Sequence, residues 1–175
     1  MRTRLLIAPL IAAALLAAAV IAAPAASAAS VKPCSSSGLV VWAGPEEGGG
    51  SAGHIAYRLE FTNLSGHTCK VSGYPSVVAV NLKGKRIGAA ATHGAGTKIG
   101  PITLKTGESA VATLQIADAL NFPKNKCHPT LAAGLRIGIP GGHGAKIAPV
   151  AFETCASAKS KTLSVGPVTT ATGTL

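Results

Sequence analysis

Methionine, aromatic residues and acidic residues are scarce in this 175-residue chain, and each scarcity excludes a class of function. The one methionine is Met1, so a soft copper site that uses methionine sulfur is excluded. Phe, Trp and Tyr make up 3% of the chain. That is too few for an exposed platform on which the bases of single-stranded nucleic acid would stack. We therefore expect no nucleic-acid partner.

Catalytic residues are also few. Only six acidic residues are present, against sixteen lysines and arginines, and Asp118 is the one aspartate. A glycosidase needs two carboxylates held across a cleft, and no pair in this sequence stands out for that role. The G-x-S-x-G match at residues 49–53 lies in a glycine run before an expected strand and not in the strand–turn–helix context of a serine nucleophile, and the glycine-rich segments lack the helix that a phosphate loop requires. We predict that the protein is not an enzyme and has no cofactor.

Neither the cysteines nor the histidines are spaced like metal ligands. The four cysteines contain no C-x-x-C pair, which excludes a thioredoxin-like redox site and a zinc ribbon. The five histidines lack the i, i+2 spacing of two ligands on one strand and the i, i+4 spacing of two on a helix. A metal site would require His93 and His143, both flanked by glycine, to meet in the fold. We predict no metal and interpret the histidines as solvated loop residues.

The N-terminal segment has the three parts of a secretory signal peptide. Arg2 and Arg4 form a positive start, an apolar stretch runs over residues 5–22, and Ala26-Ser27-Ala28 supplies a cleavage site. The alternative is a retained membrane anchor, which Pro24 and the A-x-A site disfavour. Cys34 follows Val31-Lys32-Pro33 and not a lipobox, so no lipid anchor is expected. We predict a signal peptide over residues 1–28 and a secreted protein, released or associated with the cell envelope.

Positive charge dominates the rest of the chain. Loss of Arg2 and Arg4 with the signal peptide lowers the formal net charge from +10 to +8. An excess of this size favours anionic partners such as wall polymers, acidic lipid headgroups or nucleic acid, although it also serves solubility alone. The basic residues gather in two short segments, which we interpret as a hairpin tip and a loop. The candidate contacts for an anionic ligand are Lys83, Lys85 and Arg86 in the first segment and Lys124 and Lys126 in the second.

Alternating residues predict an all-β fold. Residues 54–62 place Ile55, Tyr57, Leu59 and Phe61 on one face, which is the period-two pattern of a half-buried antiparallel strand. Strands separated by Gly/Pro turns at this spacing favour an antiparallel sandwich of about seven or eight strands. We expect one domain over residues 29–168 and a flexible tail over residues 169–175. The further strands are expected at residues 39–42, 77–82, 98–104, 109–116, 131–139, 146–152 and 161–165.

An even number of cysteines in an exported chain predicts two disulfides. Four cysteines allow three connectivities. If the strands at 39–42 and 54–62 pair, Cys34 lies beside Cys69. The strands at 131–139 and 146–152 relate Cys127 and Cys155 in the same way. We therefore favour Cys34–Cys69 and Cys127–Cys155, with a structural role.

Two short motifs allow a structural and a functional interpretation. Gly73-Tyr74-Pro75 favours a turn, in which Tyr74 closes one end of the sandwich with its hydroxyl bonded to backbone. In the functional alternative, Tyr74 is a platform for a ligand. Asn63-Leu64-Ser65 matches a glycosylation sequon, which matters only in a eukaryotic secretory host.

A set of residues along the chain resembles an exported actinobacterial family. The set comprises Cys34, Phe61-Thr62-Asn63, Ser65-Gly66, Cys69, Gly73-Tyr74-Pro75, Leu104, Gly107, Ser109-Ala110, Cys127 and Cys155. On these residues the chain resembles, over residues 34 to 168, the domain-of-unknown-function family catalogued under number 4232. The resemblance implies an immunoglobulin-like β-sandwich, exported or lipid-anchored, with no established activity. The lack of a lipobox departs from the anchored members and indicates a released protein.

Three functions remain open at this point. The first is a non-catalytic sandwich that binds an anionic polymer or other ligand of the cell envelope through its basic surface. The second is an exported structural module that docks another exported protein along a sheet edge. The third is an enzyme or metal protein.

Overall fold

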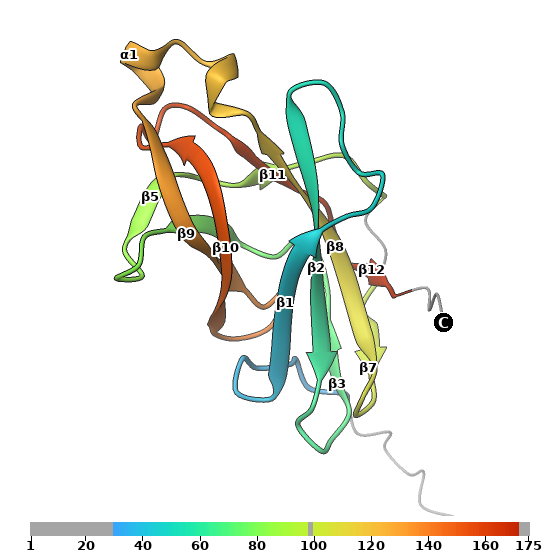
Figure 1. The fold of residues 1–175 in the computed structure, drawn as a ribbon. Helices are drawn as coiled ribbons and strands as arrows, with labels where there is room; N and C mark the ends of the chain where they lie inside the picture. Colours follow the sequence, from blue (N-terminus) through green and yellow to red (C-terminus); the bar gives the residue numbers. More distant parts are fainter. Residues whose placement is uncertain (1–29, 98–99, 172–175) are drawn as a thin grey trace, which may run out of the picture.

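The strand with the clearest alternation in the sequence lies inside the larger of two main sheets. The computed structural model describes residues 30–97 and 100–171, and the predicted signal peptide at 1–28 lies outside them. The first sheet has the order β1-β2-β8-β11-β6, and β12 also pairs with β8. All pairings are antiparallel except β11 with β6 (Figure 1). The strands are β1 (Leu39–Pro45), β2 (His54–Asn63), β6 (Thr92–His93), β8 (Ser109–Ala117), β11 (Leu163–Val165) and β12 (Thr169–Thr170).

The second sheet is antiparallel and has the order β10-β9-β4-β5. A bulge between Pro149 and Phe152 interrupts its longest pairing, that of β9 with β10. A separate pair, β3 with β7, lies at the lower end of the molecule in Figure 1. The strands are β3 (Cys69–Val71), β4 (Val77–Val80), β5 (Arg86–Ala90), β7 (Ile102–Leu104), β9 (Pro129–Gly138) and β10 (Ala145–Cys155).

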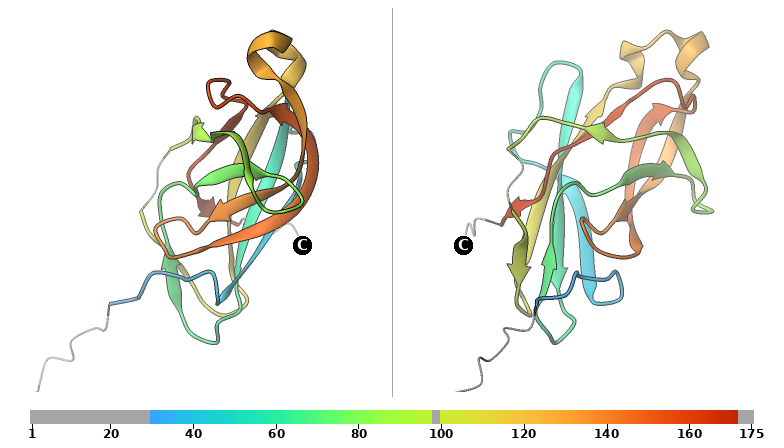
Figure 2. Two further views of the ribbon diagram at one scale, coloured as in Figure 1. Left: turned by 90° about the vertical axis from the view of Figure 1, so that its left-hand side faces the viewer. Right: turned by 180° about the vertical axis from the view of Figure 1, so that it is seen from behind.

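The two sheets share one apolar core. Leu59, Phe61 and Leu114 from the first sheet belong to the same buried cluster as Leu135 and Ile137 from the second. The sheets therefore face each other as two layers (Figures 1 and 2). Burial of these aliphatic and aromatic side chains is the main stabilising term for such a fold. The all-β prediction is confirmed.

Both disulfides form, in the two pairings favoured by the strand order. Cys34 joins Cys69 near β3, where the backbone N–H of Cys34 also donates to the carbonyl of Lys70 at 2.9 Å. Cys127 joins Cys155 at the opposite end of the sandwich, next to the end of β10. Each end of the molecule thus carries one cross-link.

Several local expectations differ from the structure. Lys124–Cys127 forms one helical turn, α1, so the interpretation of Lys124 and Lys126 as loop residues is wrong. Ala119–Asn121 forms a 3₁₀ turn, η1, capped by Asp118. Thr169–Thr170, assigned above to a flexible tail, pair with β8. Four short strands, β3, β5, β6 and β12, lie outside the expected ranges and raise the number of strands in the described residues to twelve, above the expected seven or eight.

Ile55 is a further correction. Tyr57, Leu59 and Phe61 are buried as the alternation predicts, but Ile55 on the same face is 57% exposed. The cause is the end of β1, whose last paired residue is Pro45, opposite Tyr57. Beyond that point no strand continues on this side, where β2 is bonded only to the loop of residues 46–51, at Ala56 and His54. No helix within the described residues is both long and apolar enough to cross a bilayer.

Candidate ligand-binding surfaces

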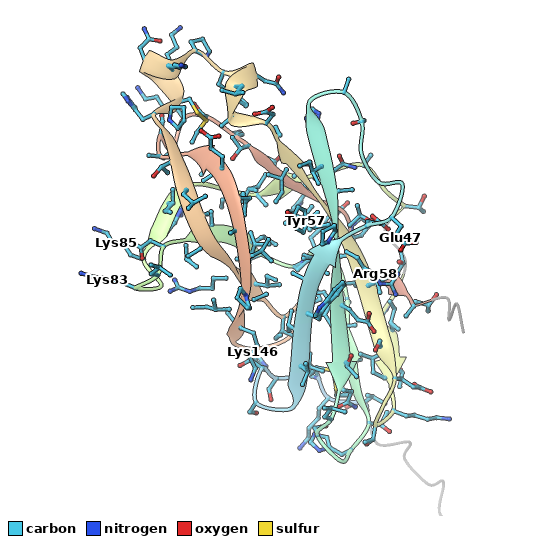
Figure 3. All side chains as sticks on the ribbon, in the orientation of Figure 1. Glu47, Tyr57, Arg58, Lys83, Lys85 and Lys146 are labelled. Atoms are coloured by element: carbon cyan, nitrogen blue, oxygen red, sulfur yellow. A yellow bond between two sulfur atoms is a disulfide. The ribbon has the colours of Figure 1, made fainter. Side chains whose placement is uncertain are left out.

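The turn between β4 and β5 is built around one side chain. The Oδ1 of Asn81 accepts hydrogen bonds from the backbone N–H groups of Lys83 (3.0 Å) and Lys85 (2.9 Å). Gly84 has a positive φ of 70°, and its N–H donates to the carbonyl of Asn81 at 2.8 Å. Such left-handed turn positions favour glycine, and asparagine suits the start of such a turn. The turn is therefore well defined, and Lys83 and Lys85 point away from the molecule (Figure 3).

Four cationic side chains surround this turn, and we call Lys83, Lys85, Arg86 and Arg136 the basic turn. Arg136 comes from β9, and its guanidinium donates to the carbonyl of Gly84. All four residues are exposed. Within the described residues the single ion pair is Arg58–Glu60, on the first sheet. The charge of the basic turn is thus not neutralised by a bonded carboxylate.

An apolar hollow of about 570 Å³ adjoins the basic turn, on the second sheet; we call it the outer hollow. Leu82 is 94% exposed and Leu131 is 71% exposed, which is unusual for leucine. Lys83 also lines the hollow, so positive charge borders aliphatic surface. The remaining lining residues are Asn81, Ala132, Ala133 and Ala151.

Of the predicted contacts for an anionic ligand, the structure brings together only one group. Lys83, Lys85 and Arg86 share the β4–β5 turn, and Arg136 joins them there. Lys124 and Lys126 lie on α1, at the top of the molecule in Figure 1, away from that turn in every view (Figures 1 and 2). The predicted basic residues therefore form two separate places.

A second hollow opens between the two sheets, and we call it the inter-sheet pocket. It has a volume of about 480 Å³. It forms because β1 has its last pairing at Pro45, whereas β2 remains paired with β8 as far as His54 and Ala117. Tyr57 lies in the space between the sheets (Figure 3). The lining residues are Ser51, Gly53, His54, Ile55, Tyr57, Ile116, Ala117, Asp118, Ala151, Phe152 and Glu153.

Hydrogen bonds fix the rim of the inter-sheet pocket. The carbonyl of Gly53 accepts from the backbone N–H of Asp118 and from the side-chain amide of Asn121, both at 2.9 Å. Asp118 caps η1 by accepting from the N–H of Leu120 at 2.9 Å. The turn before β2 is therefore bound to the segment after β8.

Tyr74 stacks on a histidine. Its ring lies parallel to that of His93, with centroids 4.0 Å apart and planes 8° apart. No hydrogen bond of the Tyr74 hydroxyl is present among the described residues, so the expected bond to backbone is absent there. The backbone of Gly73 has a positive φ of 77°, which a glycine turn explains, and Pro75 is buried.

The histidines do not converge. His93 stacks on Tyr74, whereas His143 forms a bridge to Ser35 beside the first disulfide. No group of three or more histidine, cysteine or acidic residues that could hold a metal occurs in the described part of the chain.

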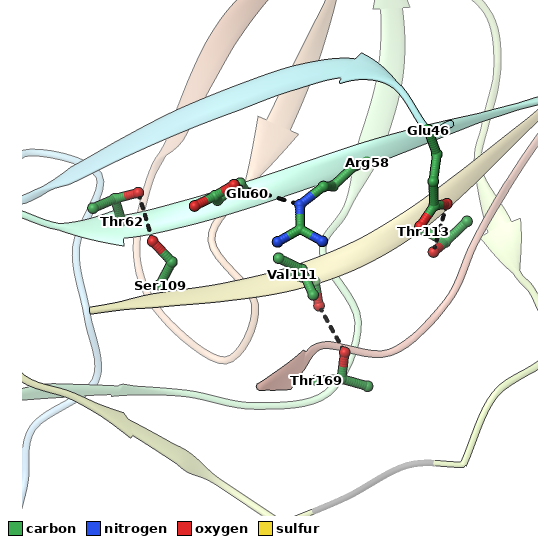
Figure 4. Close-up of polar contacts among 8 residues, drawn as sticks. All are labelled: Glu46, Arg58, Glu60, Thr62, Ser109, Val111, Thr113 and Thr169. Atoms are coloured by element: carbon green, nitrogen blue, oxygen red, sulfur yellow. Dashed lines mark hydrogen bonds and ion pairs between the residues drawn. The ribbon is translucent and has the colours of Figure 1, made fainter. Parts of the chain in front are cut away.

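The outer face of the first sheet is polar. Arg58 pairs with Glu60 at 3.4 Å, Thr113 donates to Glu46 at 3.2 Å, and the hydroxyls of Thr62 and Ser109 lie 2.9 Å apart (Figure 4). Thr169 of β12 donates to the carbonyl of Val111 at the margin of this face.

Two apolar residues of β1 are exceptions on that face: Val40 is 50% exposed and Trp42 is 51% exposed. The Trp42 indole lies over Gly44, where a Cβ atom would come within 2.2 Å of the ring. The exposure of Trp42 was not predicted from the sequence.

Asn63 has a structural role that the sequon does not indicate. It is fully buried, and its side-chain amide donates to the carbonyls of His67 (2.8 Å) and Leu104 (2.9 Å). Its Oδ1 accepts from the N–H (3.0 Å) and the hydroxyl (2.7 Å) of Ser65. An amide nitrogen occupied in this way is not accessible for glycosylation.

Comparison with known proteins identifies a family and no individual relative. The family described as "Domain of unknown function (DUF4232)" has a model that matches residues 34–169. No curated protein and no solved structure matches the chain.

Proposed function

The chain belongs to the DUF4232 family, and from that premise we propose that it is an exported, non-catalytic module that binds an anionic ligand of the cell envelope. The observation that carries the proposal is the basic turn. Four exposed cations from the β4–β5 turn, β5 and β9 gather around one turn, beside exposed leucines. The predicted signal peptide and the two disulfides support export, because disulfides persist in oxidising compartments.

Charge alone does not choose between the anionic ligands of an envelope, but the leucines favour one of them. Leu82 protrudes from the tip of the turn between Asn81 and Lys83, and Leu131 borders the outer hollow beside it. Exposed aliphatic side chains next to lysines suit a surface that offers anionic headgroups and acyl chains together. We therefore propose an acidic lipid surface as the ligand, ahead of an anionic polymer without acyl chains.

The chemistry of the site is that of binding. Residues lining the outer hollow include no carboxylate, histidine or thiol. The lysines supply charge, the leucines supply apolar area, and Asn81 holds the turn in place.

Docking along a sheet edge is less well supported. The edge strand β10 contains Pro149 and a bulge, and the edge strand β1 has its last pairing at Pro45. Proline and bulges are the devices that prevent strand addition at an edge.

Co-sedimentation of the oxidised protein without residues 1–28 tests the proposal. The particles are acidic phospholipid vesicles, zwitterionic vesicles and an immobilised anionic wall polymer, each at low and high salt. We expect binding to acidic vesicles that falls steeply as salt rises, because exposed charges are screened. A basic residue near an acidic membrane contributes about 1 kcal/mol, so the Lys83→Gln, Lys85→Gln double variant is expected to bind about 30-fold more weakly.

The two basic places of the fold supply a matched control. The Lys124→Gln, Lys126→Gln double variant removes the same charge from α1 and is expected to change binding by less than about threefold. Leu82→Asn distinguishes a lipid ligand from a polymer, because it is expected to weaken binding to vesicles and to leave binding to the polymer unchanged. Equal losses from both lysine pairs, or binding insensitive to salt, would refute the basic turn as the site. Binding to the polymer alone would refute the lipid.

A further inference from the structure

The inter-sheet pocket differs in charge from the rest of the molecule. Basic residues outnumber acidic residues sixteen to six over the whole chain. The eleven residues that line this pocket nevertheless include two carboxylates, Asp118 and Glu153, and no lysine or arginine. One third of the acidic residues of the chain thus lie at this one opening.

Aromatic rings form the apolar part of the same pocket. Tyr57 from β2 is 8% exposed and Phe152 from β10 is 9% exposed, and both line it. The two rings come from opposite sheets, so apolar surface is available from both sides. The Tyr57 hydroxyl takes part in no hydrogen bond among the described residues, and it is not a buried atom without a partner. That hydroxyl is therefore accessible to water and to a ligand.

The carboxylates come from separate elements that are held in place. Asp118 follows β8 and is fixed by its own cap to η1 and by the bond of its N–H to Gly53. Glu153 lies on β10, opposite Leu131 of β9 in the register of the second sheet. Both residues are exposed and line the pocket, and Tyr57 and Phe152 beside them are buried.

We propose that the inter-sheet pocket binds a small organic cation, a protonated amine that carries an apolar or aromatic body. The body packs between Tyr57 and Phe152, and the ammonium group lies toward Asp118 and Glu153. Aromatic faces attract cations, and a carboxylate attracts them more strongly when the site is partly desolvated. A volume of about 480 Å³ lies within the range of roughly 300–1,000 Å³ found for small-molecule sites.

This site has a different charge from the basic turn. The two hollows are neighbours, since Ala151 of β10 lines both, but Asp118 and Glu153 line the inter-sheet pocket and Lys83 lines the outer hollow. The proposal therefore does not rest on binding to an envelope. Its ligand is a cation, whereas the ligand proposed for the basic turn is anionic.

Three probes of similar shape and different charge test the proposal. Phenethylamine is cationic, phenethyl alcohol is neutral and hydrocinnamate is anionic at neutral pH. Each is titrated into the isotopically labelled, oxidised protein, and amide chemical shifts are followed by NMR. We expect phenethylamine to bind most tightly, with shifts concentrated at Ala117, Asp118 and residues 151–153.

Variants that preserve the fold distinguish the contribution of ligand charge to binding from that of ligand shape. Asp118→Asn keeps a side chain able to cap η1, and Glu153→Gln keeps the size of the exposed side chain. Each is expected to weaken phenethylamine binding about fivefold, with little effect on phenethyl alcohol. Glu108→Gln, which removes an exposed carboxylate outside the pocket, is the matched control and is expected to leave the affinity unchanged.

The outcomes are decisive in both directions. Tyr57→Phe is expected to weaken the binding of every probe that contacts the Tyr57 hydroxyl, and to change the free energy of unfolding little. If the amine, the alcohol and the carboxylate bind equally, or if no probe shifts the pocket amides, the proposal is wrong. If the Lys83→Gln, Lys85→Gln variant loses the amine site as well, the two sites are not independent.

Discussion

At one end of the β2–β8 strand pair, the buried side chain of Asn63 makes a network of hydrogen bonds. At the other end, His54 and Asp118 border an open pocket. Asn63 connects the β2–β3 loop to Leu104 of β7, and its backbone N–H and carbonyl pair with Glu108 and Gly107. At the opposite end the bonds of Gly53 and Asn121 lie on the rim, and the aromatic rings below are reachable.

The difference follows from what covers each end. At the closed end β1 runs alongside β2 as far as Leu39 opposite Asn63. At the open end β1 has already turned away at Pro45, so the space between β2 and β10 has no strand over it. The closed end is expected to contribute more to stability, and the open end holds the pocket proposed above as a ligand site. Matched substitutions at the two ends are therefore expected to lower the free energy of unfolding by unequal amounts.

Truncation of phenylalanine should separate the two ends most clearly. Phe61 is fully buried, and Phe61→Ala is expected to lower the free energy of unfolding by about 3–5 kcal/mol. Phe152 is 9% exposed and lines the pocket, so Phe152→Ala enlarges a hollow that is already open to solvent and is expected to cost less, about 2–3 kcal/mol. Denaturant unfolding of the oxidised proteins measures both values. Equal losses would show that the pocket end is as tightly packed as the closed end.

The disulfides test whether the two ends differ in cross-linking as well. Cys34 and Cys69 are 35 residues apart, and Cys127 and Cys155 are 28 apart. The chain-entropy relation gives about 3.8 and about 3.6 kcal/mol for loops of these lengths. Replacing each pair by alanine is therefore expected to cost nearly the same stability. Losses that differ by more than about 1 kcal/mol would show that the disulfides contribute to the difference in stability between the two ends.

The sequence was sufficient for the parts of the fold that depend on local pattern. Alternation located β2 and the strand at residues 131–139, and the cysteine positions relative to the strands led to both disulfide pairs. The family resemblance is confirmed by the match over residues 34–169. The immunoglobulin-like strand order stays a prediction.

The candidate sites depended on contacts between distant segments, which local pattern does not contain. Arg136 reaches the β4–β5 turn only because β9 pairs with β4. Ile55 looked like a core residue because alternation does not show where the neighbouring strand ends. The inter-sheet pocket joins residues of β2, β8 and β10, whose pairing had to be known first. The lysines of the turn and of α1 looked equivalent in sequence and are separate in space.

Two asparagines, one at each end, provide the finest test of the comparison. Asn63→Ala removes a buried amide and leaves the carbonyls of His67 and Leu104 and the N–H of Ser65 without their partner. We expect a loss of about 2–3 kcal/mol, because each buried group left unsatisfied is costly. Asn121→Ala removes one bond to Gly53 on an exposed rim, where water replaces it, and is expected to cost less than about 1 kcal/mol. Denaturant unfolding gives both values, and amide hydrogen exchange at residues 64–68 should speed up only in the Asn63 variant. If the two substitutions cost the same, the closed end is not held by its buried amide, and the difference between the ends lies in packing alone.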